Sequence, residues 1–184
     1  MPFEEMKIQG AWVHTPDRHV DKRGSFQETF RLSEISSSLG RDFRVAQVNQ
    51  SISNKGVIRG IHHTQSLAGQ AKYISCSKGE IWDVVVDLRP DSRTYGEWDG
   101  VLLSEENGKS VLISENLGHA FLSLEDGSVS TYLCTAEYNP MADIAIHPLS
   151  PSIGIDFRSM GATRGIGDFQ LSDRDAQATA FQPK

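Results

Sequence analysis

Two histidines stand side by side in the stretch RGIHHTQ, residues 59–65, whose residue types predict a β-strand. Successive side chains of a strand point to opposite faces, so His62 and His63 cannot readily bind one metal ion. The stretch that follows them, TQSLAGQAK, offers no Asp or Glu as an oxygen ligand and ends in Lys72. A metal site is therefore the weaker hypothesis. One histidine facing a cavity is instead suited to accept a proton, because the ordinary pKa of imidazole lies near neutral pH.

A single histidine would by default be interpreted as a core residue bonded to a backbone carbonyl. Here, however, several other polar side chains also fall within or beside apolar runs, where a polar group without a partner is costly. These side chains are Arg59, Lys72, Asp83, His119 and Tyr132. We expect them to converge on one cavity. An arginine in an apolar strand favours an anionic ligand, and a diphosphate fits the fork of its guanidinium group.

Two aspartates occur in the run EIWDVVVDL, residues 80–88, which has apolar side chains on both faces. That pattern is typical of a strand covered on two sides. Asp83 and Asp87 are four positions apart and therefore share one face of the strand. Either carboxylate fits a polar cavity. For Asp87, an acid at the end of the strand that accepts hydrogen bonds from backbone amides carries equal weight.

The elements that must position these side chains are mostly β-strands. Short runs rich in Val, Ile, Tyr and Trp, separated by Gly, Asn, Asp and Ser, predict an all-β sandwich or barrel. The predicted strands lie within residues 43–51, 56–64, 71–77, 79–89, 109–115, 118–124 and 128–135. No linker, charge block or internal repeat divides the chain, so we expect one domain over residues 1–184.

Two stretches predict short helices at the margins of this domain. In residues 31–40, Leu32, Ile35 and Leu39 fall on one helical face, and Gly40 suits the position after a helix end. In residues 172–178, Ser172 is suited to cap the start of a second helix.

Composition narrows the class of protein. A formal charge of −6 and a pI near 5.5 argue against a general affinity for nucleic acid or anionic membranes. Cys76 and Cys134 lack the spacing of a zinc or redox pair and are expected to be buried thiols in a reducing compartment. The sequence has neither a signal-peptide pattern nor a long apolar run, so we expect a cytoplasmic protein.

Nine motifs in order resemble those of the dTDP-4-dehydrorhamnose 3,5-epimerases over nearly the whole chain. They are D-K-R-G-S-F-Q-E (21–28), Q-V-N-Q-S (47–51), V-I-R-G-I-H (57–62), G-Q-A-K (69–72), D-V-V-V-D-L-R (83–89), Y-G-E-W (95–98), G-H-A-F (118–121), Y-L-C-T-A-E-Y-N-P (132–140) and L-S-D-R-D (171–175). The resemblance implies an isomerase with a cupin-like jelly roll that needs neither metal nor cofactor. It also implies a homodimer with exchanged N-terminal strands, and a C-terminal segment, 165–184, that packs over the barrel.

The substrate implied by this resemblance is dTDP-4-dehydro-6-deoxy-D-glucose, inverted at C3, C5 or both. His62 would remove the proton beside the C4 ketone, and Asp175 would orient His62 and stabilise its charged form. Lys72 would stabilise the enolate oxygen, and Tyr132 would return a proton to the opposite face of the ring. The remaining positions that match substrate-binding residues, some of them reaching in from the partner subunit, are Arg23, Phe26, Glu28, Gln47, Asn49, Arg59, Asp83, His119 and Tyr138.

Alternatives remain open for several of these residues and for the function. The pattern S-x-x-D at Ser172 and Asp175 is also a helix-start box, and Tyr132 and Tyr138 also fit a strand tyrosine and a rim aromatic. Asn116 and Ala120 replace glycines that the family commonly has near His119, a drift that resembles the branch serving antibiotic deoxysugars. The alternatives are thus an epimerase of one carbon only, a metal-dependent cupin oxygenase, or a sugar-nucleotide-binding module without turnover.

Overall fold

The computed structural model describes residues 3–66 and 69–183 of the chain. The predicted domain, 1–184, therefore extends beyond the described residues at both ends and at positions 67–68, and Lys184 of the predicted segment 165–184 also lies outside them. The strands are β1 (Phe3–Glu5), β2 (Ala11–His14), β3 (Arg18–Asp21), β4 (Gly24–Gln27), β5 (Gln47–Ser53), β6 (Ile58–Thr64), β7 (Lys72–Lys78), β8 (Glu80–Asp87), β9 (Trp98–Ser104), β10 (Ser110–Ile113), β11 (Leu117–Ser123), β12 (Ser128–Cys134) and β13 (Asp143–Ala145). The helices are α1 (Leu32–Leu39), α2 (Phe157–Ala162) and α3 (Asp173–Ala176).

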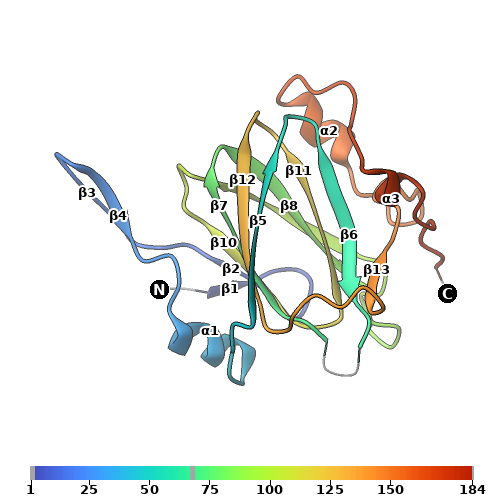
Figure 1. Ribbon diagram of the computed structural model, residues 1–184, viewed down its shortest axis with the longest axis horizontal. Helices are drawn as coiled ribbons and strands as arrows, with labels where there is room; N and C mark the ends of the chain where they lie inside the picture. The colour runs from blue at the N-terminus through green and yellow to red at the C-terminus, as the bar shows by residue number, and fades with distance from the viewer. Residues whose placement is uncertain (1–2, 67–68, 184) are drawn as a thin grey trace.

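Two antiparallel sheets face one another and form the body of the protein (Figure 1). The six-stranded sheet has the order β1-β2-β10-β7-β12-β5, and the five-stranded sheet has the order β13-β6-β11-β8-β9. Consecutive strands frequently fall in different sheets, as β5 and β6 do, and β7 and β8. The predicted all-β architecture with short helices at its margins is confirmed.

The core of the described residues has one layer between the sheets, a second outside the five-stranded sheet and a third where α1 packs against the six-stranded sheet. Val85 of β8 is fully buried among residues of the first layer, while Val84 and Val86 are buried in the second. Trp82 belongs to the outer layer, where it meets the ring of Phe157 of α2 edge-on. The strand is therefore covered on two sides, as its sequence predicts.

The helices agree only partly with the predicted pattern. α1 occupies the predicted stretch and ends at Gly40, whose φ of 70° is left-handed. Of the three apolar residues that share one face, Ile35 is buried, whereas Leu32, in the first turn, is 51% exposed. α3 is capped by Ser172 as predicted. α2 was not predicted, because its sequence FRSMGA lacks a clear helical repeat.

An N-terminal hairpin, β3–β4, projects away from the two sheets (Figure 1). Every residue of β3 is exposed, and the hairpin holds two large apolar side chains in solvent: Val20 is 76% exposed and Phe26 is 70% exposed. The exchange of N-terminal strands in a dimer remains a prediction.

The two cysteines are buried and unpaired, as predicted. Burial raises the pKa of the Cys76 thiol to about 11, so this group is protonated and unreactive at neutral pH. Among the helices of the described residues, none combines the length and the apolar character that crossing a membrane would require.

Candidate active site

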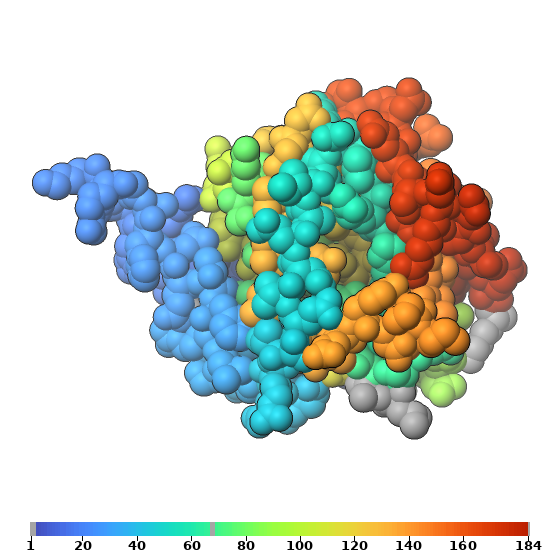
Figure 2. All heavy atoms as spheres, in the orientation of Figure 1, coloured from blue at the N-terminus to red at the C-terminus, as the bar shows by residue number. Residues whose placement is uncertain are grey.

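A cavity of about 430 Å³ opens between the two sheets, within the size range of small-molecule sites. The five-stranded sheet contributes residues of β6 and β11, and the six-stranded sheet contributes residues of β5, β7 and β12. Residues 170–172, 174 and 175 form part of the rim. Figure 2 shows the molecule hollowed between β5 and the C-terminal segment.

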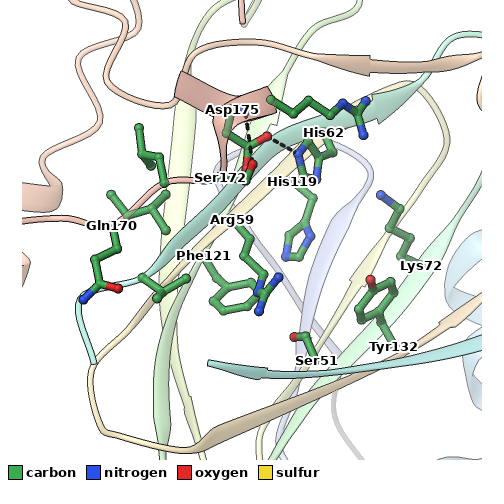
Figure 3. A pocket seen from close by; sticks show the side chains of 14 residues that line it. Ser51, Arg59, His62, Lys72, His119, Phe121, Tyr132, Gln170, Ser172 and Asp175 are labelled. Atoms are coloured by element: carbon green, nitrogen blue, oxygen red, sulfur yellow. Dashed lines mark hydrogen bonds and ion pairs between the residues drawn. The ribbon is translucent and has the colours of Figure 1, made fainter. Parts of the chain in front are cut away.

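His62 lies in the cavity wall and pairs with a carboxylate from the other end of the chain. Its Nε2 is 2.6 Å from Oδ1 of Asp175, which is only 4% exposed (Figure 3). Burial tends to raise the pKa of Asp175, but hydrogen bonds from His62, Gly60 and Ser172 and the charge of His62 outweigh it and hold that pKa below its usual value. Asp175 is therefore charged at neutral pH and suited to stabilise a protonated imidazole. Because Nε2 of His62 contacts Asp175, Nδ1 is the ring nitrogen left to accept a proton when Nε2 carries the hydrogen.

Asp175 fills both of the roles that the sequence left open, as part of a helix-start box and as the partner of His62. Its backbone N–H donates to the Ser172 hydroxyl at 3.1 Å, as in a helix-start box. Its carboxylate at the same time reaches His62 and accepts from the backbone N–H of Gly60 at 3.4 Å. Capping α3 and holding the histidine are thus parts of one arrangement.

A bulge in β6 brings Arg59 and His62 to the same cavity. The two residues are three positions apart and would point to opposite faces of a regular strand. Their partners on β11, Phe121 and His119, are only two positions apart, so β6 carries one extra residue between the pairs. Gly60 permits this geometry: its φ is +113°, and a Cβ there would lie 2.5 Å from the carbonyl oxygen of His119. His63, by contrast, does not line the cavity, as expected for the neighbour of His62.

Lys72 and Tyr132 come from the opposite sheet, where they lie on adjacent strands β7 and β12. Figure 3 shows both side chains across the cavity from His62 and Asp175. Burial lowers the pKa of Lys72, and the nearby groups Cys134, Asp143 and Asp83 act in the opposite direction. Burial raises the pKa of Tyr132 above its ordinary value near 10, so its phenol is protonated at neutral pH.

A second histidine–carboxylate pair stands beside the first. His119 lines the cavity, and its Nε2 is 2.7 Å from Oδ2 of Asp83. Asp83 is fully buried behind His119 and does not itself line the cavity. Asp87, on the same face of β8, instead accepts hydrogen bonds from the backbone and side chain of Arg89 and from two hydroxyl groups. Asp87 is thus an acid at the end of the strand that accepts hydrogen bonds from a backbone amide and nearby side chains, one of the two roles that its sequence allowed.

Arg59 supplies positive charge to the cavity. Its guanidinium group donates to the hydroxyl of Ser53 at 3.0 Å and to the carbonyl of Ile52 at 3.2 Å, both neutral acceptors. Within residues 3–66 and 69–183 it has no carboxylate partner. Its charge is therefore available to an anionic ligand.

Gln47, Asn49 and Tyr138 form a polar group next to the cavity rather than in its wall. Gln47 donates to Asn49 at 2.7 Å and accepts from the backbone N–H of Tyr138 at 2.7 Å. On β5, residues 47, 49 and 51 share a face, and Ser51 lines the cavity. Asn49 is directly opposite Tyr132 in the sheet. The polar group thus extends the cavity along β5, with Tyr138 59% exposed at its end.

Arg23, Phe26 and Glu28 do not reach the cavity of their own chain. Arg23 pairs with Asp21 at 2.6 Å in the exposed hairpin, and Glu28 pairs with Arg31 at 2.8 Å. Phe26 faces solvent. None of the three lines the cavity, and the hairpin β3–β4 projects away from the two sheets (Figure 1).

Some cavity residues were missed by the sequence analysis. They are Ser51, Val57, Ile58, Phe121, Gln170, Leu171, Ser172 (assigned only as a cap) and Arg174. Ser51 was detectable, since it alternates with Gln47 and Asn49. Nothing local in the sequence distinguishes Arg174 from a solvated helix residue. Among the described residues no three His, Cys, Asp or Glu side chains are grouped to hold a metal ion.

The arrangement is suited to moving a proton at a carbon acid. A charged carboxylate supports an imidazole on one wall, an ammonium group can stabilise a developing oxyanion, and a protonated phenol stands on the other wall. A flat intermediate held between the walls could lose a proton to one side and gain one from the other.

Comparisons with known proteins agree with this chemistry. Residues 5–183 match the model of a family described as dTDP-4-dehydrorhamnose 3,5-epimerase. A Mycobacterium tuberculosis protein of that name is 41% identical over 182 residues, 99% of this chain and 88% of the relative. The solved structure of NovW, a 4-keto-6-deoxy sugar epimerase from the novobiocin gene cluster of Streptomyces spheroides, is 38% identical with a TM-score of 0.91, covering 98% of this chain and 87% of that one.

A third relative acts on one carbon. ChmJ, a 3'-monoepimerase from Streptomyces bikiniensis solved in complex with dTDP-quinovose, is 41% identical with a TM-score of 0.88, covering 95% of this chain and 85% of that one. The likeness extends over both sheets, so the predicted cupin-like jelly roll is confirmed.

Proposed function

Since this chain belongs to the dTDP-4-dehydrorhamnose 3,5-epimerase family, we propose that it inverts C3, C5 or both in dTDP-4-dehydro-6-deoxy-D-glucose. It is an epimerase of the isomerase class. The reaction removes a proton from a carbon beside the C4 ketone and returns one to the opposite face. Neither step transfers a hydride, so the proposed reaction uses the side chains of the cavity alone.

One observation carries this proposal: His62 and Tyr132 stand on different sheets and face each other across the cavity (Figure 3). Inversion needs a base on one side of the ring and an acid on the other, because a base that returned its own proton would restore the starting configuration. His62 is the proposed base and Tyr132 the proposed acid. The raised pKa of Tyr132 favours this assignment, since it keeps the phenol protonated.

The other residues of the proposed site would stabilise charges that form or are carried by the substrate and by His62. Asp175, charged and almost fully buried, would orient His62 and stabilise its imidazolium form. Lys72 would stabilise the negative charge that develops on the ketone oxygen when the proton leaves, which lowers the barrier to a step that is difficult in water. Arg59 is the proposed partner of the diphosphate, supported by its exposure to the cavity and its neutral neighbours. His119 would contact the sugar, and Asp83, buried behind it, would hold the His119 ring in place rather than touch the substrate as its sequence position implied.

We also propose a cytoplasmic homodimer whose subunits complete each other's sites. Arg23, Phe26 and Glu28 lie on or next to a projecting hairpin and would reach the nucleotide in the partner's cavity, beside Gln47, Asn49 and Tyr138. The 70% exposure of Phe26 supports this proposal, because a large apolar side chain held in solvent favours an interface. Two buried free thiols suit the reducing cytoplasm.

A single inversion is the second candidate, supported by the likeness to ChmJ, a 3'-monoepimerase. Both candidates share the base, the acid and the cavity. They differ in whether the ring can turn so that a second carbon meets the same pair of residues.

Proton NMR of dTDP-4-dehydro-6-deoxy-D-glucose in deuterated buffer, following C3 and C5 separately, tests the proposal. Deuterium incorporation with inversion at both carbons identifies the double epimerase, and at one carbon alone the single epimerase. If dTDP binds but neither carbon exchanges, the protein is a binding module and the proposed activity is wrong.

A further inference from the structure

The segment that carries Asp175 crosses the rim of the cavity and is fixed at both ends. Gln170 forms a parallel bridge with Val57, just before β6, and Thr179 forms a parallel bridge with Ile146, just after β13. Leu171 packs against the outer core layer, and Phe181 is buried in that layer. Figure 1 shows this C-terminal part of the chain beside β6 and β13.

Between these ends, α3 lacks the apolar contacts that usually hold a helix in place. Its four residues are Asp173, Arg174, Asp175 and Ala176, of which only Asp175 is buried. Among the described residues its polar contacts with the barrel come from two side chains. Asp175 bonds to His62 and Gly60, and Arg174 bonds to Asp143. The contact of Arg174 is therefore the one that orients α3 independently of the catalytic pair.

Arg174 forms two hydrogen bonds to Asp143, one from each terminal nitrogen of its guanidinium group. Nη1 donates to Oδ2 of Asp143 at 2.6 Å, and Nη2 donates to the backbone carbonyl of the same residue at 3.0 Å. Asp143 begins β13, and that strand pairs with β6 so that Ala145 is directly opposite His62. Arg174 thus connects α3, which carries Asp175, to β13, the strand that pairs with β6 beside His62.

We infer that Arg174 is a positioning residue, which acts through Asp143 to set the approach of Asp175 to His62. This inference rests on the proposed proton abstraction by His62. An ion pair whose arginine is 46% exposed contributes little to folding. A catalytic carboxylate is more sensitive to its support, because a displacement of about 1 Å can lower a rate about 10²-fold.

Arg174 also lines the cavity, so direct contact with an anionic ligand is the competing role. The two terminal nitrogens of Arg174, Nη1 and Nη2, both donate hydrogen bonds to Asp143. This use of the guanidinium group favours the positioning role over direct contact with a ligand. The two roles predict different kinetics. A ligand contact affects KM and dTDP affinity, whereas a positioning residue affects kcat.

Arg174→Met tests the inference. We expect kcat for proton exchange to fall about 10- to 100-fold, with KM and the Kd of dTDP within about threefold of the wild type. Arg174→Lys retains a cation for the Asp143 carboxylate but loses the second contact of the fork, to the backbone carbonyl, so it should recover only part of the lost kcat. Arg164→Met is the matched control. It removes an arginine that pairs with Glu80 at 2.8 Å in the same C-terminal part of the chain, and it should leave kcat and KM unchanged.

Asp143→Asn and the double variant Arg174→Met/Asp143→Asn show whether the two residues act as a unit. The double variant should be no slower than the slower single variant by more than about twofold, because both changes remove the same contact. Independent, multiplying losses would overturn the inference. So would an unchanged kcat in Arg174→Met, or a raised KM with kcat retained.

A spectroscopic readout tests positioning without turnover. The imidazole N–H resonance of His62, assigned by its loss in His62→Asn, reports the bond to Asp175. In Arg174→Met we expect this resonance to shift upfield and its exchange with water to accelerate at least about tenfold, while Arg164→Met leaves it unchanged. If the wild type failed to turn over but the resonance responded as expected, the proposed function would be wrong and the positioning role correct. An unchanged resonance in Arg174→Met would overturn the positioning role.

Discussion

Asp83 and Asp87 lie on the same face of β8 and are both fully buried, yet their surroundings differ. Asp87 accepts from the backbone N–H and the guanidinium group of Arg89 and from the hydroxyl groups of Ser92 and Thr94, at 2.6 to 3.0 Å. Asp83 bonds to His119, and within the described residues its Oδ1 has no partner.

The difference separates a carboxylate that supports the fold from one that serves the site. A buried charge is tolerated when its oxygen atoms are satisfied, and Asp87 meets that condition with groups of its own turn. Asp83 has a single strong contact, and this contact reaches the cavity through His119. Replacing each with asparagine should therefore affect stability in one case and catalysis in the other.

Asp87→Asn should have the largest effect on folding. We expect the free energy of unfolding to fall by about 3 kcal/mol, because an amide cannot accept all the donors that face Asp87 and leaves Arg89 without its partner. Chemical denaturation measures the change. Asp91→Asn, an exposed aspartate in the same turn, is the control and should alter stability by less than about 0.5 kcal/mol. Equal stability of Asp87→Asn and the wild type would remove the contrast with Asp83.

Asp83→Asn should mainly lower the rate. We expect kcat to fall about 10²-fold, equivalent to about 2.7 kcal/mol of barrier, because the ring nitrogen of His119 loses the carboxylate that fixes its tautomer. Steady-state kinetics at matched folded concentration measures it. A variant that unfolds like Asp87→Asn, with the activity of its folded fraction intact, would place Asp83 with the structural carboxylates.

Acid should reduce the stability difference between Asp87→Asn and the wild type. Burial tends to raise the pKa of Asp87, but its hydrogen bonds hold that pKa well below the usual value. A depressed folded-state pKa stabilises the protein above the unfolded pKa near ~4, and this stabilisation is lost as the pH falls towards the folded value. We expect the difference in unfolding free energy to shrink by at least about 1 kcal/mol between pH 4 and pH 2. A difference independent of pH would mean that the charge of Asp87 does not matter.

Ser172→Ala should have the smallest effect, through the cap of the helix that carries Asp175. Loss of a cap destabilises a helix by about 1 kcal/mol, and we expect kcat to fall severalfold while global unfolding changes little. Ser172→Asn retains a capping side chain and should keep kcat close to the wild type. If both variants lost activity equally, the hydroxyl would have a role other than capping.

The sequence predicted the β-strands and several polar side chains of the cavity, because the alternation of side chains and the apolar character of a run can be read from neighbouring residues. Lys72, His119 and Tyr132 could be assigned to apolar strands from their neighbours alone, and they do reach the cavity. Val84, Val85 and Val86 similarly revealed a strand covered on two sides.

What the sequence could not predict depends on contacts between distant segments. The bulge at Gly60 brings Arg59 and His62 to one face. A single glycine in a strand is compatible with a bulge but does not by itself establish one. Arg174 resembles a solvated helix residue until its pairing with Asp143, 31 positions away, is visible. The hairpin of Arg23 and Phe26 projects from the chain, so its proposed contacts depend on a second subunit.

The central claim, a base on one sheet and an acid on the other, is tested most directly by deuterium exchange in Tyr132→Phe beside His62→Ala. With the base intact, Tyr132→Phe should still exchange a proton at C3 or C5 for deuterium, while inversion slows by at least about 10²-fold. His62→Ala should abolish exchange and retain dTDP binding. Inversion at the wild-type rate in Tyr132→Phe, or undiminished exchange in His62→Ala, would contradict the account.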